Sequence, residues 1–222
     1  AAFNGRTALQ GAAESGNWEI LSMLLSAGAR IDAPAGAKLG MTALQAACLN
    51  GHSLMARFFL AQQANLNAAP SPVAGVTPIQ AAATHGDIGL VRDLINLGAE
   101  VDTPATKMGR TALLAAIKHK SLPLLEILIQ YGANVNPTEG YELSSPLGEA
   151  TYLDWFEGAE FLLKVGANVN ASLGRVISDK YMDSVPYLLS PLGWAISNKA
   201  EYMAGLLLQH GADVLATNMF DG

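Results

Sequence analysis

The stretch 5–16 reads GRTALQGAAESG, and close copies recur as GMTALQAACLNG at 40–51 and GVTPIQAAATHG at 75–86. The repeated phrase holds no obvious catalytic group. Looser copies follow, and each copy opens on a Thr or Ser: Thr7, Thr42, Thr77, Thr111, Ser145 and Ser190. The spacings are 35, 35, 34, 34 and 45 residues. Periods of this size are typical of an array of stacked supersecondary units.

Each unit divides into a part of fixed length and a part of variable length. From the opening Thr or Ser to the residue before the closing Ala, the distance is 21 residues in all six copies, ending at Gly28, Gln63, Gly98, Gly132, Gly166 and Gly211. All variation in the spacing lies in the residues that follow. Packed elements keep their length, whereas surface loops vary. The sequence therefore predicts a rigid segment followed by a variable finger in every unit.

The rigid segment has the features of two short helices. The opening Thr or Ser suits a helix N-cap, and in three units Pro follows at the favoured first helical position. Five residues after the cap stands an invariant Ala, which indicates close backbone packing: Ala12, Ala47, Ala82, Ala116, Ala150 and Ala195. Glycine at 16, 51 and 86 predicts a left-handed end of the first helix. The last three units carry Lys120, Asp154 and Lys199 there, which leaves their turn geometry open.

The pattern resembles the ankyrin repeat, with Gln10, Gln45 and Gln80 in place of the family's usual His. With its long fingers it looks similar to the large fungal ankyrin arrays. The resemblance implies an all-α ankyrin-repeat solenoid of six helix-turn-helix units with finger hairpins or loops. We expect a single ankyrin repeat domain over 1–222, as a fragment of a longer multidomain chain. The expected repeats are 4–33, 39–68, 74–103, 108–137, 142–171 and 187–216, with a long finger insertion at 171–189.

Composition and motifs exclude several classes of function. A net charge of −6 disfavours nucleic acid as a partner, and no apolar run reaches the roughly 18 residues of a membrane helix. The single cysteine, Cys48, fits a reducing compartment, so we expect an intracellular, cytoplasmic location. We also expect the array to be monomeric. His85 and His119 share a register but are expected roughly 10 Å apart, too far to bind one metal. No catalytic residue, metal or cofactor is predicted.

By the resemblance, the fingers and first helices line a concave groove, and the sequence predicts a non-enzymatic module that binds a protein or extended peptide there. Segment 103–120 holds four bases and no acid, whereas segment 139–183 holds eight acids and three bases. This predicts a basic centre of the groove beside an acidic end, although a solvated surface explains the charges too. The finger tips are apolar, either to bind a partner or to pack on one another. The candidate binding residues are Arg6, Met41, Val76, His85, Met108, Arg110, Lys118, His119, Tyr152, Tyr181 and Tyr187.

Three alternatives remain open. The groove could hold another domain of the same protein, as an intramolecular regulatory or sensor array. The apolar finger tips could form a small-molecule or enzymatic site, which a closed pocket lined by Met41, Val76 and Met108 would favour. The array could also be a structural spacer without a specific ligand.

Overall fold

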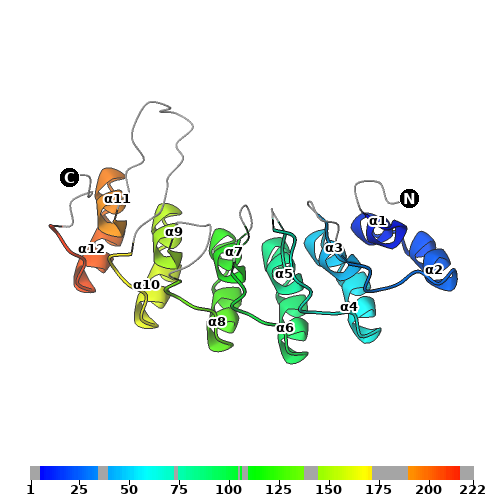
Figure 1. Cartoon of the computed structure of the whole chain (residues 1–222). Helices are drawn as coiled ribbons and strands as arrows, with labels where there is room; N and C mark the ends of the chain where they lie inside the picture. The colour runs from blue at the N-terminus through cyan, green and yellow to red at the C-terminus, as the bar shows by residue number, and fades with distance from the viewer. Residues whose placement is uncertain are drawn as a thin grey trace.

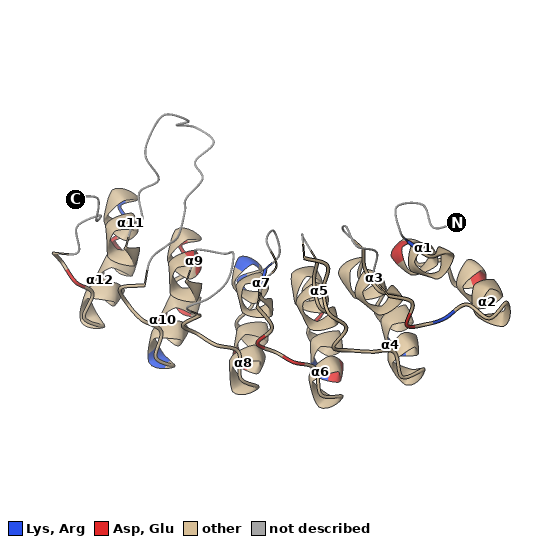
Figure 2. Ribbon diagram, viewed as in Figure 1, with Lys and Arg blue, Asp and Glu red and all other residues tan. Residues whose placement is uncertain are grey.

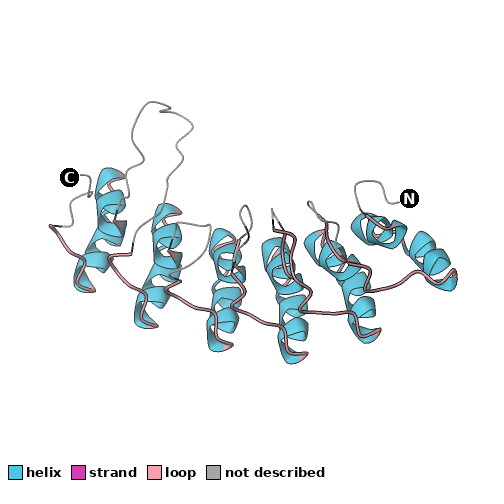
Figure 3. Cartoon of the chain, in the orientation of Figure 1, coloured by secondary structure: helices cyan, strands magenta, loops and turns pink. Residues whose placement is uncertain are grey.

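The computed structural model describes residues 6–34, 40–72, 75–104, 106, 110–137, 145–171 and 190–215. Within these ranges the chain forms twelve helices and no strand (Figure 3), which confirms the predicted all-α architecture. The first helices of the six units are α1 (Ala8–Ser15), α3 (Ala43–Leu49), α5 (Pro78–His85), α7 (Ala112–Lys118), α9 (Pro146–Tyr152) and α11 (Pro191–Ser197). The second helices are α2 (Trp18–Ser26), α4 (Ser53–Ala61), α6 (Ile88–Asn96), α8 (Leu122–Gln130), α10 (Phe156–Lys164) and α12 (Glu201–Gln209).

The helices lie in two parallel rows (Figure 1). Each first helix packs on its own second helix and on the first helices of the neighbouring repeats. The array bends so that the row of first helices lies on its inner side. The invariant Ala five residues after each cap is buried in every repeat, which lets neighbouring backbones approach closely.

The predicted N-caps of the first helices are confirmed. All six Thr or Ser side chains accept a hydrogen bond from the backbone N–H three residues on, as in Gly148 N to Ser145 Oγ at 3.0 Å. In the first three repeats the side chain of a glutamine also accepts a hydrogen bond from the backbone N–H of the N-cap residue, which completes a capping box. In repeat 2, for example, Thr42 N donates to Gln45 Oε1 at 2.7 Å. The caps satisfy N–H groups that would otherwise lack a partner.

The same glutamines also hold the fingers. Gln45 Nε2 donates to Ala68 O at 2.9 Å, and Gln10 and Gln80 donate in the same way to carbonyls 23 residues further on. Each amide therefore ties the start of a repeat to its own finger. Repeats 4, 5 and 6 carry Leu114, Gly148 and Gly193 at this position, which have no side-chain amide.

The turn between the two helices keeps one conformation in all six repeats. Gly16, Gly51 and Gly86 have φ between 68° and 84°, as predicted. The open question about the last three repeats is answered, because their turn residues have φ of 49°, 48° and 57° and are also left-handed: Lys120, Asp154 and Lys199. A residue with a Cβ adopts this conformation at a cost of about 1–2 kcal/mol.

A ladder of Asp and Asn side chains crosses all five boundaries between repeats. The acceptor stands four residues after the position that closes the rigid segment, and it receives a backbone N–H of the next repeat. The bonds of 2.7–2.9 Å run from Asn65 to Asp32, from Glu100 to Asn67, from Asn134 to Asp102, from Asn168 to Asn136 and from Asp213 to Asn170. In the sixth repeat Leu215 takes this position.

Candidate functional site

The predicted groove positions at the N-terminal repeats are largely engaged in packing. Val76 is only 7% exposed and belongs to the core, which favours packing over binding, the two roles left open for the finger residues. Met41 is half-buried and packs against the same core. Arg6 pairs with Glu14 through Nη1 and Oε2 at 2.5 Å. Repeats 1 to 3 therefore offer little apolar surface at these positions.

Three of the predicted site residues lie outside the described residues: Met108, Tyr181 and Tyr187. The long finger that contains the two tyrosines is described only at its first residue, Ala171. Their part in the groove stays a prediction.

The histidines link neighbouring repeats at the turns between helices. His119 Nε2 lies 2.8 Å from Thr84 O, and His52 Nε2 lies 3.1 Å from Glu14 O. The His85 ring covers Gly51 so closely that a Cβ there would lie 2.1 Å from its Nε2. His85 and His119 thus contact the preceding repeat. The role of His52 was missed because it stands at a different register.

The predicted basic centre of the groove contains an acid as well. Arg110, just before α7, lies 3.9 Å from Glu149 on α9 of the next repeat, measured from Nη1 to Oε1. Lys118 is exposed at the end of α7. Figure 2 shows where Lys, Arg, Asp and Glu stand along the described part of the ribbon. A base of segment 103–120 therefore lies beside an acid of the following repeat, and the basic centre of the groove stays a prediction.

An aromatic pair lies beside these charges. The rings of Tyr152, at the end of α9, and Trp194, on α11, have centroids 4.9 Å apart at an interplanar angle of 36°. Tyr152 is 45% exposed and Trp194 is half-buried. Sequence reasoning missed Trp194 as a site residue. The available signal was its size, because the first four repeats carry small residues at this register: Gly11, Ala46, Ala81 and Ala115.

Cys48 lies in a setting that suppresses its reactivity. The thiol is fully buried. Its burial and the nearby charge of Asp87 raise the pKa of Cys48 to about 12. A thiol with so high a pKa stays protonated at neutral pH and is a poor nucleophile.

Asp87 caps α6 and accepts a hydrogen bond from Leu90 N at 2.9 Å. Burial alone would raise the pKa of this carboxyl. Hydrogen bonds from the Ser53 hydroxyl and from backbone N–H groups, together with the charge of Arg57, outweigh burial and lower it. Asp87 is therefore a structural carboxylate that joins repeats 2 and 3. Among the described residues, no cluster of three or more His, Cys, Asp or Glu side chains could hold a metal ion.

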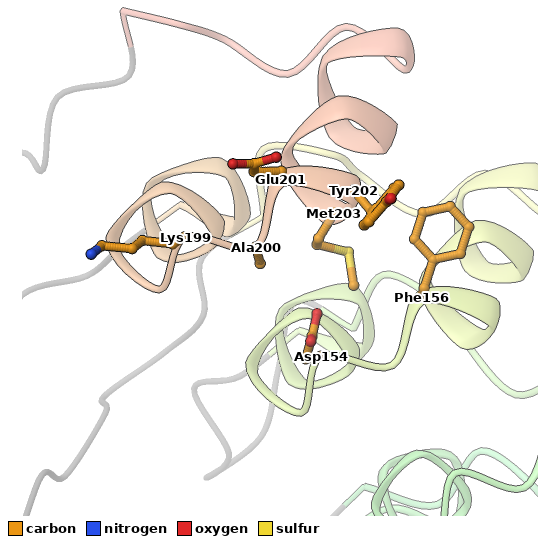
Figure 4. Close-up of a pocket in the computed structure, with 7 residues that line it drawn as sticks. All are labelled: Asp154, Phe156, Lys199, Ala200, Glu201, Tyr202 and Met203. Atoms are coloured by element: carbon orange, nitrogen blue, oxygen red, sulfur yellow. The ribbon is translucent and has the colours of Figure 1, made fainter.

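A pocket of about 500 Å³ opens between repeats 5 and 6 (Figure 4), and none of the predicted site residues lines it. Its lining residues are Asp154, Phe156, Lys199, Ala200, Glu201, Tyr202 and Met203. A smaller hollow of about 160 Å³ lies between α6 and α8, beside Tyr131. Sequence reasoning missed both hollows. No helix in the described ranges is long and apolar enough to span a membrane.

The chain is similar to solved ankyrin repeat domains over nearly its whole length. Human ASB11 matches with 25% identity and a TM-score of 0.71, over 96% of this chain and 88% of that domain. An ankyrin repeat domain from Acinetobacter baumannii matches with 26% identity and a TM-score of 0.70, over 92% and 98%. The domain of Bcl-3, of the IκB protein family, has 24% identity, a TM-score of 0.66 and coverage of 95% and 89%, and this likeness shows the fold alone.

Sequence models of protein families also match this chain. A model described as ankyrin repeats (3 copies) matches residues 35–105, 63–139 and 79–173, and one described as ankyrin repeats (many copies) matches residues 9–60. No curated protein sequence matches the chain. The two family models together cover most of the capped helix pairs described above, and the chain belongs to the ankyrin repeat family.

Proposed function

We propose that this chain is a protein-interaction module that binds a protein or extended peptide on the inner face of its first helices, with the centre of binding in repeats 4 to 6. The observation that carries the proposal is the Tyr152–Trp194 pair, which leaves Tyr152 45% exposed at this face. Tyr, Trp and Arg are the residue types that most often dominate binding energy at protein interfaces. Ankyrin repeat domains are typically protein-interaction modules.

The surrounding charges favour a partner with both polar and apolar groups. Lys118 is exposed one repeat before Tyr152, and the Arg110–Glu149 pair lies between the repeats. Mixed charge at the edge of an aromatic contact contributes to specificity and to the rate of association more than to affinity. We therefore propose that the aromatic pair anchors the partner and that Lys118 and the ion pair orient it.

The proposal is tested by affinity capture with the wild-type chain and two variants. We expect the double variant Tyr152→Ala/Lys118→Glu to capture at least tenfold less of each partner than the wild type captures. Tyr131→Ala is the matched control, because Tyr131 is a similarly exposed tyrosine that ends α8 in the other row of helices. Circular dichroism checks that both variants fold. Equal capture by the wild type and the double variant contradicts the proposal.

The finer expectations remain part of this proposal. They are a single non-catalytic domain, a monomeric array, an intracellular and cytoplasmic location, and a likeness to fungal arrays. The compared structures named by source come from human and Acinetobacter baumannii proteins, so they support the family rather than the fungal likeness. The pocket between repeats 5 and 6 shares no residue with the finger tips predicted for a small-molecule site, and it gives that alternative no support at the expected place.

A further inference from the structure

The pocket between repeats 5 and 6 is lined by Asp154 of the turn in repeat 5 and by Ala200, which stands at the position of His52 in repeat 2. Across the first three boundaries His52, His85 and His119 each reach the turn of the preceding repeat. At the last boundary, Asn198 bonds instead to Trp194 O of its own helix, and Ala200 is too short to bridge. Repeat 6 thus has no histidine at either of the positions that bridge the first three boundaries, and the pocket lies at its boundary with repeat 5.

The walls of this pocket are aromatic and its base is apolar. Phe156 begins α10 and is 42% exposed, whereas Tyr202 lies in the first turn of α12 and is 89% exposed. Met203, which also lines the pocket, is almost fully buried. A volume of about 500 Å³ is within the range of pockets that bind small ligands or anchor side chains. The exposed aromatic faces would gain contact area from an occupant.

The charges around the pocket favour a cation. Two carboxylates line it, Asp154 and Glu201, and Glu157 lies nearby in the first turn of α10. The lining base, Lys199, extends away from the aromatic side chains in Figure 4. The positive end of the α12 helix dipole opposes a cation, but Glu201 in the first turn of α12 offsets it.

We propose that this pocket binds an arginine side chain of a partner polypeptide. A guanidinium group is planar, stacks on aromatic faces and hydrogen-bonds to carboxylates, so it suits a pocket lined by Phe156, Tyr202 and two acids. A lysine ammonium is more strongly hydrated and lacks the planar surface. The pocket shares no residue with the proposed groove. This inference therefore goes beyond the proposed function and stands or falls separately.

The test uses the wild-type chain and the tripeptide acetyl-Gly-Arg-Gly-amide, observed by NMR through the Tyr202 ring and the Met203 methyl group. We expect saturable shifts at these two residues that weaken with added salt. A matched peptide with citrulline, which keeps the shape but not the charge, should bind at least tenfold more weakly, and a lysine peptide should also bind more weakly. Equal binding of the citrulline or the lysine peptide overturns the assignment.

Two variants localise the effect. Tyr202→Ala removes a side chain that is almost fully exposed, so folding should be preserved, and Asp154→Asn keeps a residue that tolerates the left-handed turn. We expect at least a fivefold loss of arginine-peptide binding in each, and no loss in Tyr131→Ala. Retained binding in both variants overturns the proposal, as does the absence of site-selective shifts in the wild type. Substitution of Tyr152 tests the groove only, so its effect on partner capture does not bear on arginine-peptide binding in the pocket.

Discussion

Repeats 1 to 3 and repeats 4 to 6 form the same helix pairs but stabilise them by different contacts. In the first three repeats a buried glutamine joins the N-cap to the finger, and glycine forms the turn between helices. The last three repeats lack the glutamine, and their turns force residues with side chains into the left-handed conformation. The two halves thus share a fold and differ in how much local stabilisation each repeat carries.

This difference coincides with the distribution of the candidate sites. The Tyr152–Trp194 pair, the Arg110–Glu149 pair and the pocket beside Tyr202 all lie in repeats 4 to 6. Residues that do not optimise stability often mark functional surfaces, because binding requires exposed or strained groups that packing would remove. We infer that the first half serves mainly as a scaffold and that the second half carries recognition.

The largest effect is expected from Gln45→Leu, which gives repeat 2 the residue type of repeat 4. Gln45 is fully buried, and its loss leaves Thr42 N–H and Ala68 C=O without their partner. We expect the free energy of unfolding to fall by about 3 kcal/mol, measured by urea denaturation. Gln130→Leu, at an exposed position of α8, should change it by less than about 0.5 kcal/mol. Similar values for the two variants would remove the basis of the comparison.

The next largest effect is a difference in stability between alanine variants of two glycines in the first half, Gly51 and Gly86. An added Cβ at Gly51 would lie 2.1 Å from His85 Nε2, whereas at Gly86 the nearest atom, on His119, is 3.7 Å away. Both alanine variants suffer the left-handed strain, of about 1–2 kcal/mol, but only Gly51→Ala also displaces a histidine. Thermal or urea unfolding should show Gly51→Ala to be the less stable variant. The opposite order contradicts the role assigned to the histidine contacts.

The smallest effect is a gain of stability in the second half. Lys120→Gly relieves the left-handed strain at φ 49°. Since glycine also increases the entropy of the unfolded chain, we expect a net gain of about 0.5–1 kcal/mol. Lys118→Gly removes the same charge from a helical position and should lower stability by up to about 1 kcal/mol. If Lys120→Gly gives no gain in urea denaturation, the turns of the second half carry no strain of this size.

Local signals in the sequence were sufficient to predict the helix pairs. The caps at Thr7 through Ser190 and the left-handed glycines follow from contacts within a few residues, and the fixed spacing of 21 residues identified the packed part. The second bond of each glutamine was not predicted, because its carbonyl partner lies 23 residues away on a finger of variable length.

The candidate site was harder to predict because it depends on contacts between repeats. Counting charges along the chain separates a basic segment from an acidic one, but it does not show that Arg110 lies beside Glu149 of the next repeat. Val76 looks like an exposed finger residue in the sequence but is buried by the three-dimensional packing. The pocket is lined by residues of both repeat 5 and repeat 6, so no single motif displays it.

The ladder of Asp and Asn side chains gives the array a uniform joint. Every boundary uses a side-chain oxygen of one repeat and a backbone N–H of the next, whatever the other residues of the two repeats are. A backbone donor is present at this place in each of repeats 2 to 6, so duplication or exchange of a unit that carries the Asp or Asn, as repeats 1 to 5 do, preserves the joint. Surface residues such as Tyr152 and Tyr202 can then diversify without altering the way in which successive units connect.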